Sequence, residues 1–342
     1  MPSLLVEIGT EELPLAALDA VYFDLKTAIQ QMLEIHRIGF KSICVEATPR
    51  RIALFVEDLA DRQENRELEF SGPSHEKSYD DMGNPTPALM GFLKSKGAAL
   101  KDIRIKETPK GRFVVIQKKE RGKTSREVIP VLLKDTIQSL PFPKRMRWEK
   151  SAFRFPRPIR WIVALLDRKL IPVQLADVKA SRQSFGHRFL SPKSFTILKA
   201  DWSQYQALLK KGQVTLSLAE RESVIRKGLQ RFNQKTFDED LVHTTAQLAE
   251  DPFLIQASFS SAYLDLPAEV LASCMKKNQK IFACYDAKGR LINRFVAVLN
   301  GKRRGLAKIH ADYENVLESR LRDARYFYDL DTKTSLEDKL PL

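Results

Sequence analysis

A proline-rich and strongly basic segment in the middle of the chain most constrains the fold. Residues 141–160 hold four prolines and seven Lys or Arg side chains, against one acidic residue, Glu149. Each proline lacks a backbone N–H and clashes with the preceding helical turn, so the segment disfavours a continuous helix. We therefore predict a long basic loop here, between regular elements on either side.

The patterns around this loop predict both helices and strands. Thr124-x-x-Glu127 matches a capping box, which predicts a helix ending before Pro141. Apolar residues spaced by three and four predict an amphipathic helix over 15–32 and a last helix over 312–328. Short apolar runs predict strands at 3–8, 42–47, 52–57, 112–117, 161–166 and 170–175, and a hairpin at 281–299. Loops are predicted at 9–14 and 61–85.

These elements predict an α+β, multidomain chain with mixed or antiparallel sheets and packed helices. A length of 342 residues exceeds that of a typical single domain. We predict an N-terminal α+β part over 1–195, which contains the basic loop 141–160. A second α+β part over 196–342 is predicted to contain the hairpin 281–299 and the C-terminal helix.

The charge balance favours a polyanionic partner. The chain carries 57 Lys or Arg and 43 Asp or Glu, a formal net charge of +14. Such an excess favours nucleic acid as a partner, although it says nothing about the fold. A basic surface without a specific partner is the alternative.

Several classes of function lack support in the sequence. Three cysteines without metal-ligand spacing indicate reduced thiols, and no apolar run approaches the roughly 20 residues of a membrane helix. There is no phosphate-binding glycine loop, and the five histidines are scattered. We therefore expect a cytoplasmic chain with no catalytic residue, no metal site and no cofactor of its own.

The candidate sites combine cations with neighbouring aromatic side chains, which suits phosphates and exposed bases. The predicted phosphate-facing residues are Arg50, Arg51, Lys144, Arg145, Arg147, Arg157, Arg160, His187 and Arg188, with Trp148 as a stacking group. A second predicted set near the hairpin is Lys276, Lys277 and Lys280. In the alternative interpretation, Trp148, Phe153 and Phe155 are core residues and the arginines pair with the acidic first forty residues. The lysines would then protect a surface hairpin.

Seven segments, in order along nearly the whole chain, resemble motifs of the beta subunit of bacterial heterotetrameric glycyl-tRNA synthetase. They are Leu5-Val-Glu-Ile-Gly-Thr-Glu-Glu-Leu-Pro14, Thr48-Pro-Arg-Arg-Ile-Ala-Leu54, Pro141-x-Pro-Lys-x-Met-Arg-Trp148, Phe155-Pro-Arg-Pro-Ile-Arg-Trp161, Gly186-His-Arg-Phe189, Met275-Lys-x-x-Gln-Lys-x-Phe282 and Arg320-Leu-x-Asp-Ala-Arg-Tyr-Phe-Tyr328. One such match is weak, whereas seven in the family's order are specific.

The resemblance implies a non-catalytic subunit of an aminoacyl-tRNA synthetase. In this family the alpha subunit resembles a class II core and holds ATP, Mg²⁺ and glycine, and the beta subunit binds tRNA. The implied reaction is the ATP-dependent glycylation of tRNA(Gly) by a cytoplasmic alpha2-beta2 heterotetramer. The implied partners are the alpha subunit and tRNA(Gly), with neither DNA nor membrane. Glu11 and Glu12 are the candidate contacts to the alpha subunit.

The family's beta chains are longer than this one. They continue into an HD-type domain and an anticodon-binding domain, so we expect this chain to correspond to their N-terminal part. Two alternatives remain open: a stand-alone RNA-binding module that needs no alpha partner, and a purely structural subunit whose arginines lie at protein interfaces.

Overall fold

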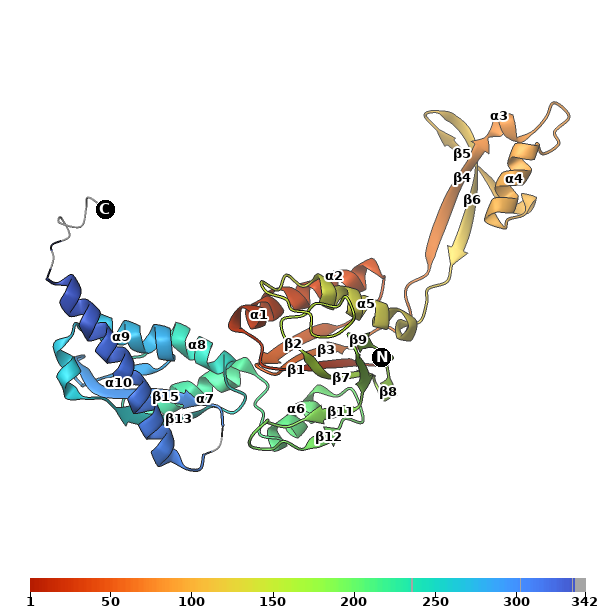
Figure 1. Cartoon of the computed structure of the whole chain (residues 1–342). Helices are drawn as coiled ribbons and strands as arrows, with labels where there is room; N and C mark the ends of the chain where they lie inside the picture. Colours follow the sequence, from red (N-terminus) through yellow and green to blue (C-terminus); the bar gives the residue numbers. More distant parts are fainter. Residues whose placement is uncertain (235, 302, 334, 336–342) are drawn as a thin grey trace. The chain divides into compact units, whose positions relative to one another are not determined.

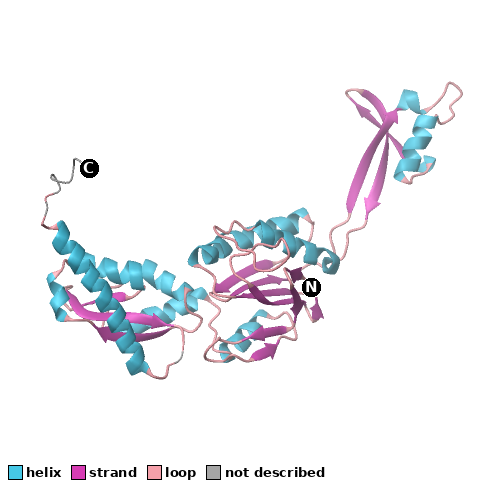
Figure 2. Cartoon of the chain, viewed as in Figure 1, coloured by secondary structure: helices cyan, strands magenta, loops and turns pink. Residues whose placement is uncertain are grey.

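The computed structural model describes residues 1–234, 236–301, 303–333 and 335. Helices and strands occur throughout the chain (Figure 2), which confirms the predicted α+β class. The chain forms two compact units. Unit 1 comprises residues 1–32, 40–59 and 129–342, and unit 2 comprises residues 33–39 and 60–128.

A seven-stranded sheet organises the first part of unit 1. Its strand order is β2-β3-β1-β7-β10-β9, and β8 pairs with β7 outside this path. Only β10 and β7 pair in parallel among these strands, so the sheet is mixed, as predicted. The strands are β1 (Leu4–Thr10), β2 (Ser42–Thr48), β3 (Arg51–Glu57), β7 (Ile159–Leu166), β8 (Lys169–Leu170), β9 (Gln174–Leu175) and β10 (Val178–Ser181).

The central strand β1 is longer than the sequence pattern predicted. Residues 9–14 were a predicted turn, yet β1 continues through Gly9 to Thr10. Gly9 lies opposite Trp161 of β7, and a Cβ on Gly9 would lie 1.9 Å from the indole ring. Glycine is therefore required here by close packing within a strand rather than by a turn.

Helices lie on both sides of this sheet (Figure 1). The predicted amphipathic helix is present as α1 (Leu15–Ala20), a π-helical turn η1 (Val21–Leu25) and α2 (Lys26–Ile35). The predicted capping box opens α5 (Ser125–Ser139), where the Glu127 carboxylate accepts hydrogen bonds from the hydroxyl and backbone N–H of Thr124. On the opposite side, α6 (Trp202–Lys211) packs against the sheet through Tyr205 and Leu209.

The second part of unit 1 is a three-stranded antiparallel sheet with helices on both faces. Its order is β13-β15-β14, and the predicted hairpin 281–299 is present as β14 and β15. Its helices and turns are α7 (Leu218–Arg231), α8 (Glu239–Gln247), η3 (Ser261–Asp265), α9 (Ala268–Cys274), η4 (Met275–Gln279) and α10 (Leu306–Asp331). The strands are β13 (Phe253–Ser258), β14 (Phe282–Tyr285) and β15 (Leu291–Leu299), and a separate short pair consists of β11 (Gln183–Phe185) and β12 (Ser194–Thr196).

Apolar side chains of β15 explain why helices cover both faces of this sheet, since successive side chains of a strand point to opposite faces. Phe295 belongs to a core cluster with Leu317 and Leu321 of α10, whereas Val296 belongs to a cluster with Ile225 of α7. The last helix extends beyond the predicted 312–328 at both ends.

Unit 2 contains a small antiparallel sheet of order β4-β6-β5. Its elements are β4 (Arg66–Ser74), α3 (His75–Ser78), α4 (Pro87–Lys96), η2 (Leu100–Asp102), β5 (Ile103–Thr108) and β6 (Gly111–Glu120). The prediction of a loop over 61–85 was wrong for β4. Leu68 and Phe70 alternate with glutamates there, a pattern typical of a strand with one wet face. The predicted domain boundary at residue 195 stays a prediction, because unit 1 contains residues on both of its sides.

Candidate nucleic-acid interface

Buried aromatic side chains fix the basic loop between α5 and β7. Phe142, Phe153 and Phe155 are all at most 6% exposed. The rings of Phe142 and Phe155 meet edge to face at 5.1 Å between centroids, and Phe153 stacks on Phe155 at 6.1 Å. Met146 and Phe155 exchange two backbone hydrogen bonds, with N–O distances of 2.9 and 3.2 Å. A segment without helix or long strand thus has a defined conformation.

These contacts show which aromatic side chains of the loop belong to the core and which could stack on a base. Phe153 and Phe155 are core residues, as the alternative interpretation held. Trp148 is half-buried and packs edge to face on Phe153, at 6.5 Å between ring centroids. Trp148 is therefore primarily a packing group of the loop, with only part of its ring at the surface.

Lys144, Arg147, Lys150 and Arg154 of the loop are exposed to solvent. We call these four residues the exposed loop cations. Within the described part of the chain, none of them forms an ion pair with a carboxylate. The lone acid of the loop, Glu149, accepts hydrogen bonds from the hydroxyl and backbone N–H of Ser151, which lower its pKa. The carboxylate of Glu149 is therefore hydrogen-bonded within the loop. The nearby charge of Arg147 also lowers its pKa.

Two other arginines of the loop have structural partners. Arg145 donates from its guanidinium to the carbonyls of Gln138, at 2.9 Å, and Leu140, at the C-terminal end of α5. A cation at this end satisfies free carbonyls and complements the helix dipole. Arg157 is half-buried and donates to the carbonyl of Pro156 at 2.9 Å. These contacts leave part of each guanidinium's donor capacity unused.

Arg160 and Arg188 pair with the acidic turn after β1. Arg160 Nε lies 3.4 Å from Glu11 Oε1, and Arg188 Nη2 lies 2.9 Å from Glu11 Oε2. Arg188 Nη1 also lies 3.6 Å from Glu12 Oε1. We call these four residues the surface ion cluster. The alternative interpretation, with arginines pairing to the acidic N-terminal region, is correct for these two arginines.

The prediction that Arg51 faces a phosphate needs correction. Its side chain is 0% exposed, with Nη1 at 2.9 Å from Glu7 Oε1 and Nε at 3.0 Å from Glu250 Oε1. Its remaining Nη2 donates to the carbonyl of Phe185 at 2.9 Å. We call Glu7, Arg51 and Glu250 the buried ion network. A guanidinium enclosed in this way cannot reach an external phosphate.

Neighbouring side chains complete the buried ion network. Trp161 Nε1 and the Ser184 hydroxyl each donate to Glu7 Oε1 at 2.9 Å, and the Thr48 hydroxyl donates to Glu250 Oε1 at 2.6 Å. Burial alone would raise the pKa of Glu250, but Arg51 and Thr48 lower it below its usual value. Burial alone would lower the pKa of Arg51. The two carboxylates outweigh this effect, so its pKa is higher than usual.

His187 also lies in the interior, which corrects its predicted role. The ring is 1% exposed, and Nε2 lies 2.7 Å from Asn300 Oδ1. Its Nδ1 accepts the backbone N–H groups of Phe189 and Leu190, at 3.2 and 3.3 Å. With Nδ1 accepting these bonds, Nε2 is assigned as the donor to Asn300, and His187 has a structural role.

Arg50 differs from its neighbour Arg51. It is half-buried, and its guanidinium lies 5.7 Å from the centre of the Trp161 ring. Its Nε is buried and has no hydrogen-bond partner in the described structure. Burial lowers the pKa of Arg50, although nearby Glu250 opposes this effect. Arg50 therefore keeps unused donor capacity close to the charges of Glu11 and Arg188.

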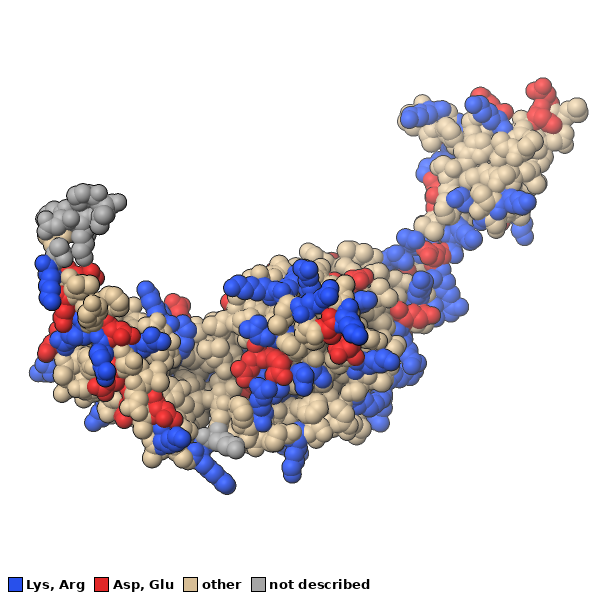
Figure 3. All heavy atoms as spheres, viewed as in Figure 1, with Lys and Arg blue, Asp and Glu red and all other residues tan. Residues whose placement is uncertain are grey.

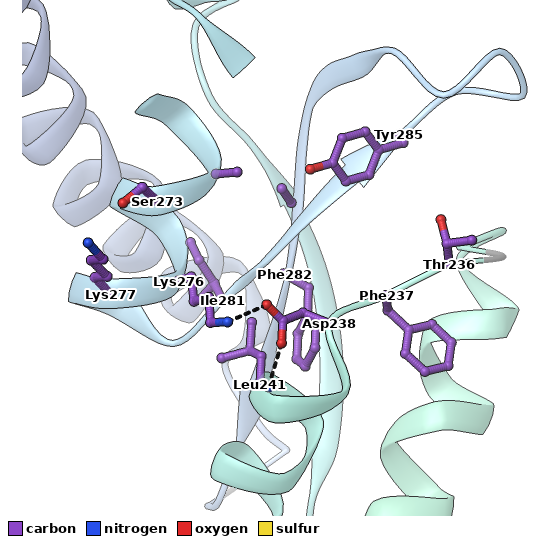
Figure 4. Close-up of a pocket in the computed structure, with 12 residues that line it drawn as sticks. Thr236, Phe237, Asp238, Leu241, Ser273, Lys276, Lys277, Ile281, Phe282 and Tyr285 are labelled. Carbon is purple, nitrogen blue, oxygen red and sulfur yellow. Dashed lines mark hydrogen bonds and ion pairs between the residues drawn. The ribbon is translucent and has the colours of Figure 1, made fainter. Parts of the chain in front are cut away.

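Two residues of the second predicted set, Lys276 and Lys277, line a cavity of about 470 Å³ beside the sheet β13-β15-β14 (Figure 4). Lys276 Nζ lies 2.5 Å from Asp238 Oδ2, and Asp238 also accepts the backbone N–H of Leu241 at 3.0 Å. Lys280 Nζ donates to the carbonyl of Lys277 at 3.2 Å. Only Lys277 of this set is exposed without such a contact from its own ammonium in the described structure.

Lys and Arg side chains occur across the visible face of unit 1, with Asp and Glu among them (Figure 3). No group of three or more His, Cys, Asp or Glu in the described residues is arranged to hold a metal ion. No helix in the described ranges is both long and apolar enough to cross a bilayer.

Comparison with known proteins identifies the family of this chain. The profile of the family described as "Glycyl-tRNA synthetase beta subunit" matches residues 4–342. The chain belongs to this family. The glycine--tRNA ligase beta subunits of Syntrophotalea carbinolica and Clostridioides difficile are 35% and 37% identical to it, each over 98% of this chain. That of Syntrophus aciditrophicus is 36% identical, also over 98% of this chain.

The chain spans about half the length of these glycyl-tRNA synthetase beta-subunit relatives, since each match covers 49% of the relative. The sequence patterns did not predict that Arg51 pairs with buried carboxylates. A signal was present, because Glu7 is the only charged residue in the apolar strand Leu4–Thr10. A buried carboxylate requires a buried cation, and Arg51 opens the next apolar strand of the sheet, β3.

Proposed function

We propose that this chain serves as a tRNA-binding and alpha-docking part of a glycine–tRNA ligase beta subunit. The observation that carries the proposal is the basic loop, where the exposed loop cations stand on a buried aromatic cluster. A fixed backbone lets cations meet phosphates without the cost of ordering a flexible segment. Family membership supports tRNA(Gly) as the polyanion.

In this proposal the phosphate-contacting groups are Lys144, Arg147 and Arg154, together with Arg157 and Arg50. Each exposed cation that meets a phosphate releases a counterion, which makes binding depend on salt. Arg50 is half-buried, so only the exposed part of its guanidinium, and not its buried Nε, is available to a phosphate. Arg145, Arg160, Arg188 and the lysines 276, 277 and 280 remain supporting candidates.

The alpha subunit is proposed to dock near the acidic turn. Glu12 is 62% exposed in its side chain and makes one long contact, whereas Glu11 is 30% exposed and is shared by two arginines. Glu12 is thus the more accessible carboxylate for a partner. The assembled cytoplasmic alpha2-beta2 enzyme would glycylate tRNA(Gly), with ATP and Mg²⁺ on the alpha subunit and no catalytic group on this chain.

The tRNA part is tested by a salt titration of tRNA(Gly) binding. The variant K144Q/R147Q/R154Q is expected to lower the slope of log affinity against log salt by about three units, one for each phosphate that is no longer neutralised. K211Q/K227Q/R231Q removes three cations from α6 and α7 and is expected to keep the slope. An equal slope for both triple variants would reject the loop as the interface.

The docking part is tested by light scattering of a mixture with the alpha subunit. A stable complex that is weakened by E12K but not by E239K, an exposed carboxylate on α8, would support docking at the acidic turn. tRNA binding without any complex would favour the stand-alone RNA-binding module. A complex without salt-dependent tRNA binding would favour the purely structural subunit.

A further inference from the structure

Helix cover is unequal on the two faces of the small sheet of unit 2. Figure 1 shows α4 against one side of β4, β5 and β6. Leu89 and Leu93 of α4 form a cluster with Val114 and Ile116 of β6. Because side chains alternate along a strand, Phe113 and Val115 point to the opposite face. No helix of unit 2, whose residues are all described, joins a core cluster on that face.

We call this opposite side the open sheet face and define it by six residues from the three strands: Glu67, Glu69, Arg104, Lys106, Phe113 and Val115. The register supports the assignment, since Arg104 pairs with Val115 and Lys106 with Phe113 across β5 and β6. Glu69 lies beside Gln117 of β6, two residues from Val115 and on the same face.

A hollow of about 380 Å³ opens on this face. Val115, at 3% exposure, lies at its lining together with the partly exposed ring of Phe113. Lys106 and Lys110 also line the hollow, the latter from the turn between β5 and β6. The hollow therefore combines an aromatic surface with flexible cations.

Charge on and around the open sheet face is positive overall. Arg104, Lys106, Lys110 and Lys119 oppose two carboxylates. Lys106 Nζ lies 2.5 Å from Glu69 Oε1, and Lys119 Nζ lies 3.5 Å from Glu67 Oε1. Arg104 and Lys110 are exposed, and neither pairs with a carboxylate among the described residues. Two cations are thus free, and two more are held by exposed pairs that a phosphate could compete for.

We propose that the open sheet face binds unpaired nucleotides of RNA, with a base on Phe113 and phosphates at Arg104, Lys106 and Lys110. The inference rests on the proposed function and adds a second tRNA-contacting surface to it. An aromatic ring on a sheet can stack only on a base whose face is not covered by pairing and helical stacking. The ligand is therefore a single-stranded segment rather than a duplex.

The stacking part is tested on the full chain by fluorescence anisotropy. The probes are a labelled RNA of about ten unpaired nucleotides and a duplex RNA of the same charge. F113L keeps an apolar side chain over Val115 but removes the ring, and it is expected to weaken single-strand binding about tenfold. F113W is expected to retain binding, and duplex binding is expected to stay unchanged in both variants.

The role of charge is tested by a variant that is expected to tighten binding rather than weaken it. E69Q removes a carboxylate and releases Lys106, so it is expected to tighten single-strand binding severalfold. R104Q/K106Q is expected to lower the salt slope by about 1.4 units, because each single-strand phosphate contact contributes about 0.7. K94Q/K96Q removes two cations at the end of α4 and serves as the control. If Glu69 and Lys106 only supported the fold, E69Q would not tighten single-strand binding.

The outcomes separate this inference from the proposed function. If the wild-type chain binds tRNA with a salt slope but F113L, E69Q and R104Q/K106Q leave single-strand binding unchanged, the open sheet face is not an RNA site and the loop proposal stands. If these variants alter assembly with the alpha subunit instead, the face is a protein interface and the inference is overturned. A wild-type chain that binds no RNA at low salt overturns both.

Discussion

Two arginine-bearing regions of unit 1 place the same side chain in opposite settings. At the start of β3, Arg51 is enclosed between Glu7 and Glu250, with its guanidinium 5.6 Å from the centre of the Trp161 ring. In the basic loop the aromatic rings are buried and the exposed loop cations face solvent. Both regions combine arginine with aromatic residues, yet only the loop exposes its charge to solvent.

The role of a guanidinium thus depends on whether a carboxylate is buried with it. The buried ion network places carboxylates on strand β1 and just after α8, so Arg51 contributes to cohesion. The loop contains one acid, and Ser151 engages it. Four measurements on variants of these residues test whether the two settings differ in this way.

R51A is expected to cause the largest loss of stability, about 3–5 kcal/mol, because it leaves two carboxylates buried without their cation. The free energy of unfolding from urea titration measures this loss. R50A changes the half-buried neighbour, which makes no buried ion pair among the described residues, and is expected to cost less. Equal costs for the two variants would contradict the distinct role of Arg51.

E250Q is expected to cost about 2 kcal/mol at neutral pH, because hydrogen bonds to a charged acceptor are removed. The pKa of Glu250 is lower in the folded chain than its usual value of 4.5. Its contribution is therefore fully present above that value and is lost as the pH falls through the lower, folded-state pKa. Urea titrations from neutral to acidic pH are expected to show the gap between wild type and E250Q narrowing below a pH of about 4.5. A constant gap would exclude this carboxylate as the titrating group.

A double-mutant cycle of E11Q and R160Q is expected to give a coupling energy of about 0.2–1 kcal/mol. Exposed ion pairs in solvent contribute only this much, because water and salt screen them. The coupling should decrease in high salt. A salt-independent value of several kcal/mol would place this pair with the buried ion network instead.

The triple variant K144Q/R147Q/R154Q is expected to have the smallest effect on stability, within about 0.5 kcal/mol for each exposed site. The same change is expected to weaken tRNA binding. Thermal unfolding and the salt titration, measured on one preparation, test both statements. A large drop in melting temperature would show that these cations support the loop rather than a ligand.

Local patterns predicted much of the fold. The Thr124–Glu127 capping box predicted α5, and the prolines of 141–160 predicted an irregular loop, because both signals act within a few residues. The missed strand β4 had a signal too, in the alternation around Leu68 and Phe70. Its exposed glutamates suggested a loop, although a strand with one wet face tolerates them.

Motifs and residue patterns alone indicated the family, the α+β class and the concentration of positive charge in one irregular loop. Which of these cations face solvent depends on the folded chain. Arg51 and Glu250 are 199 positions apart, and no local spacing indicates that they meet. Burial and ion pairing depend on such distant contacts, whereas capping, proline geometry and strand alternation depend on near neighbours. The loop cations remain a candidate interface because they are exposed, whereas Arg51 does not because two distant carboxylates enclose it.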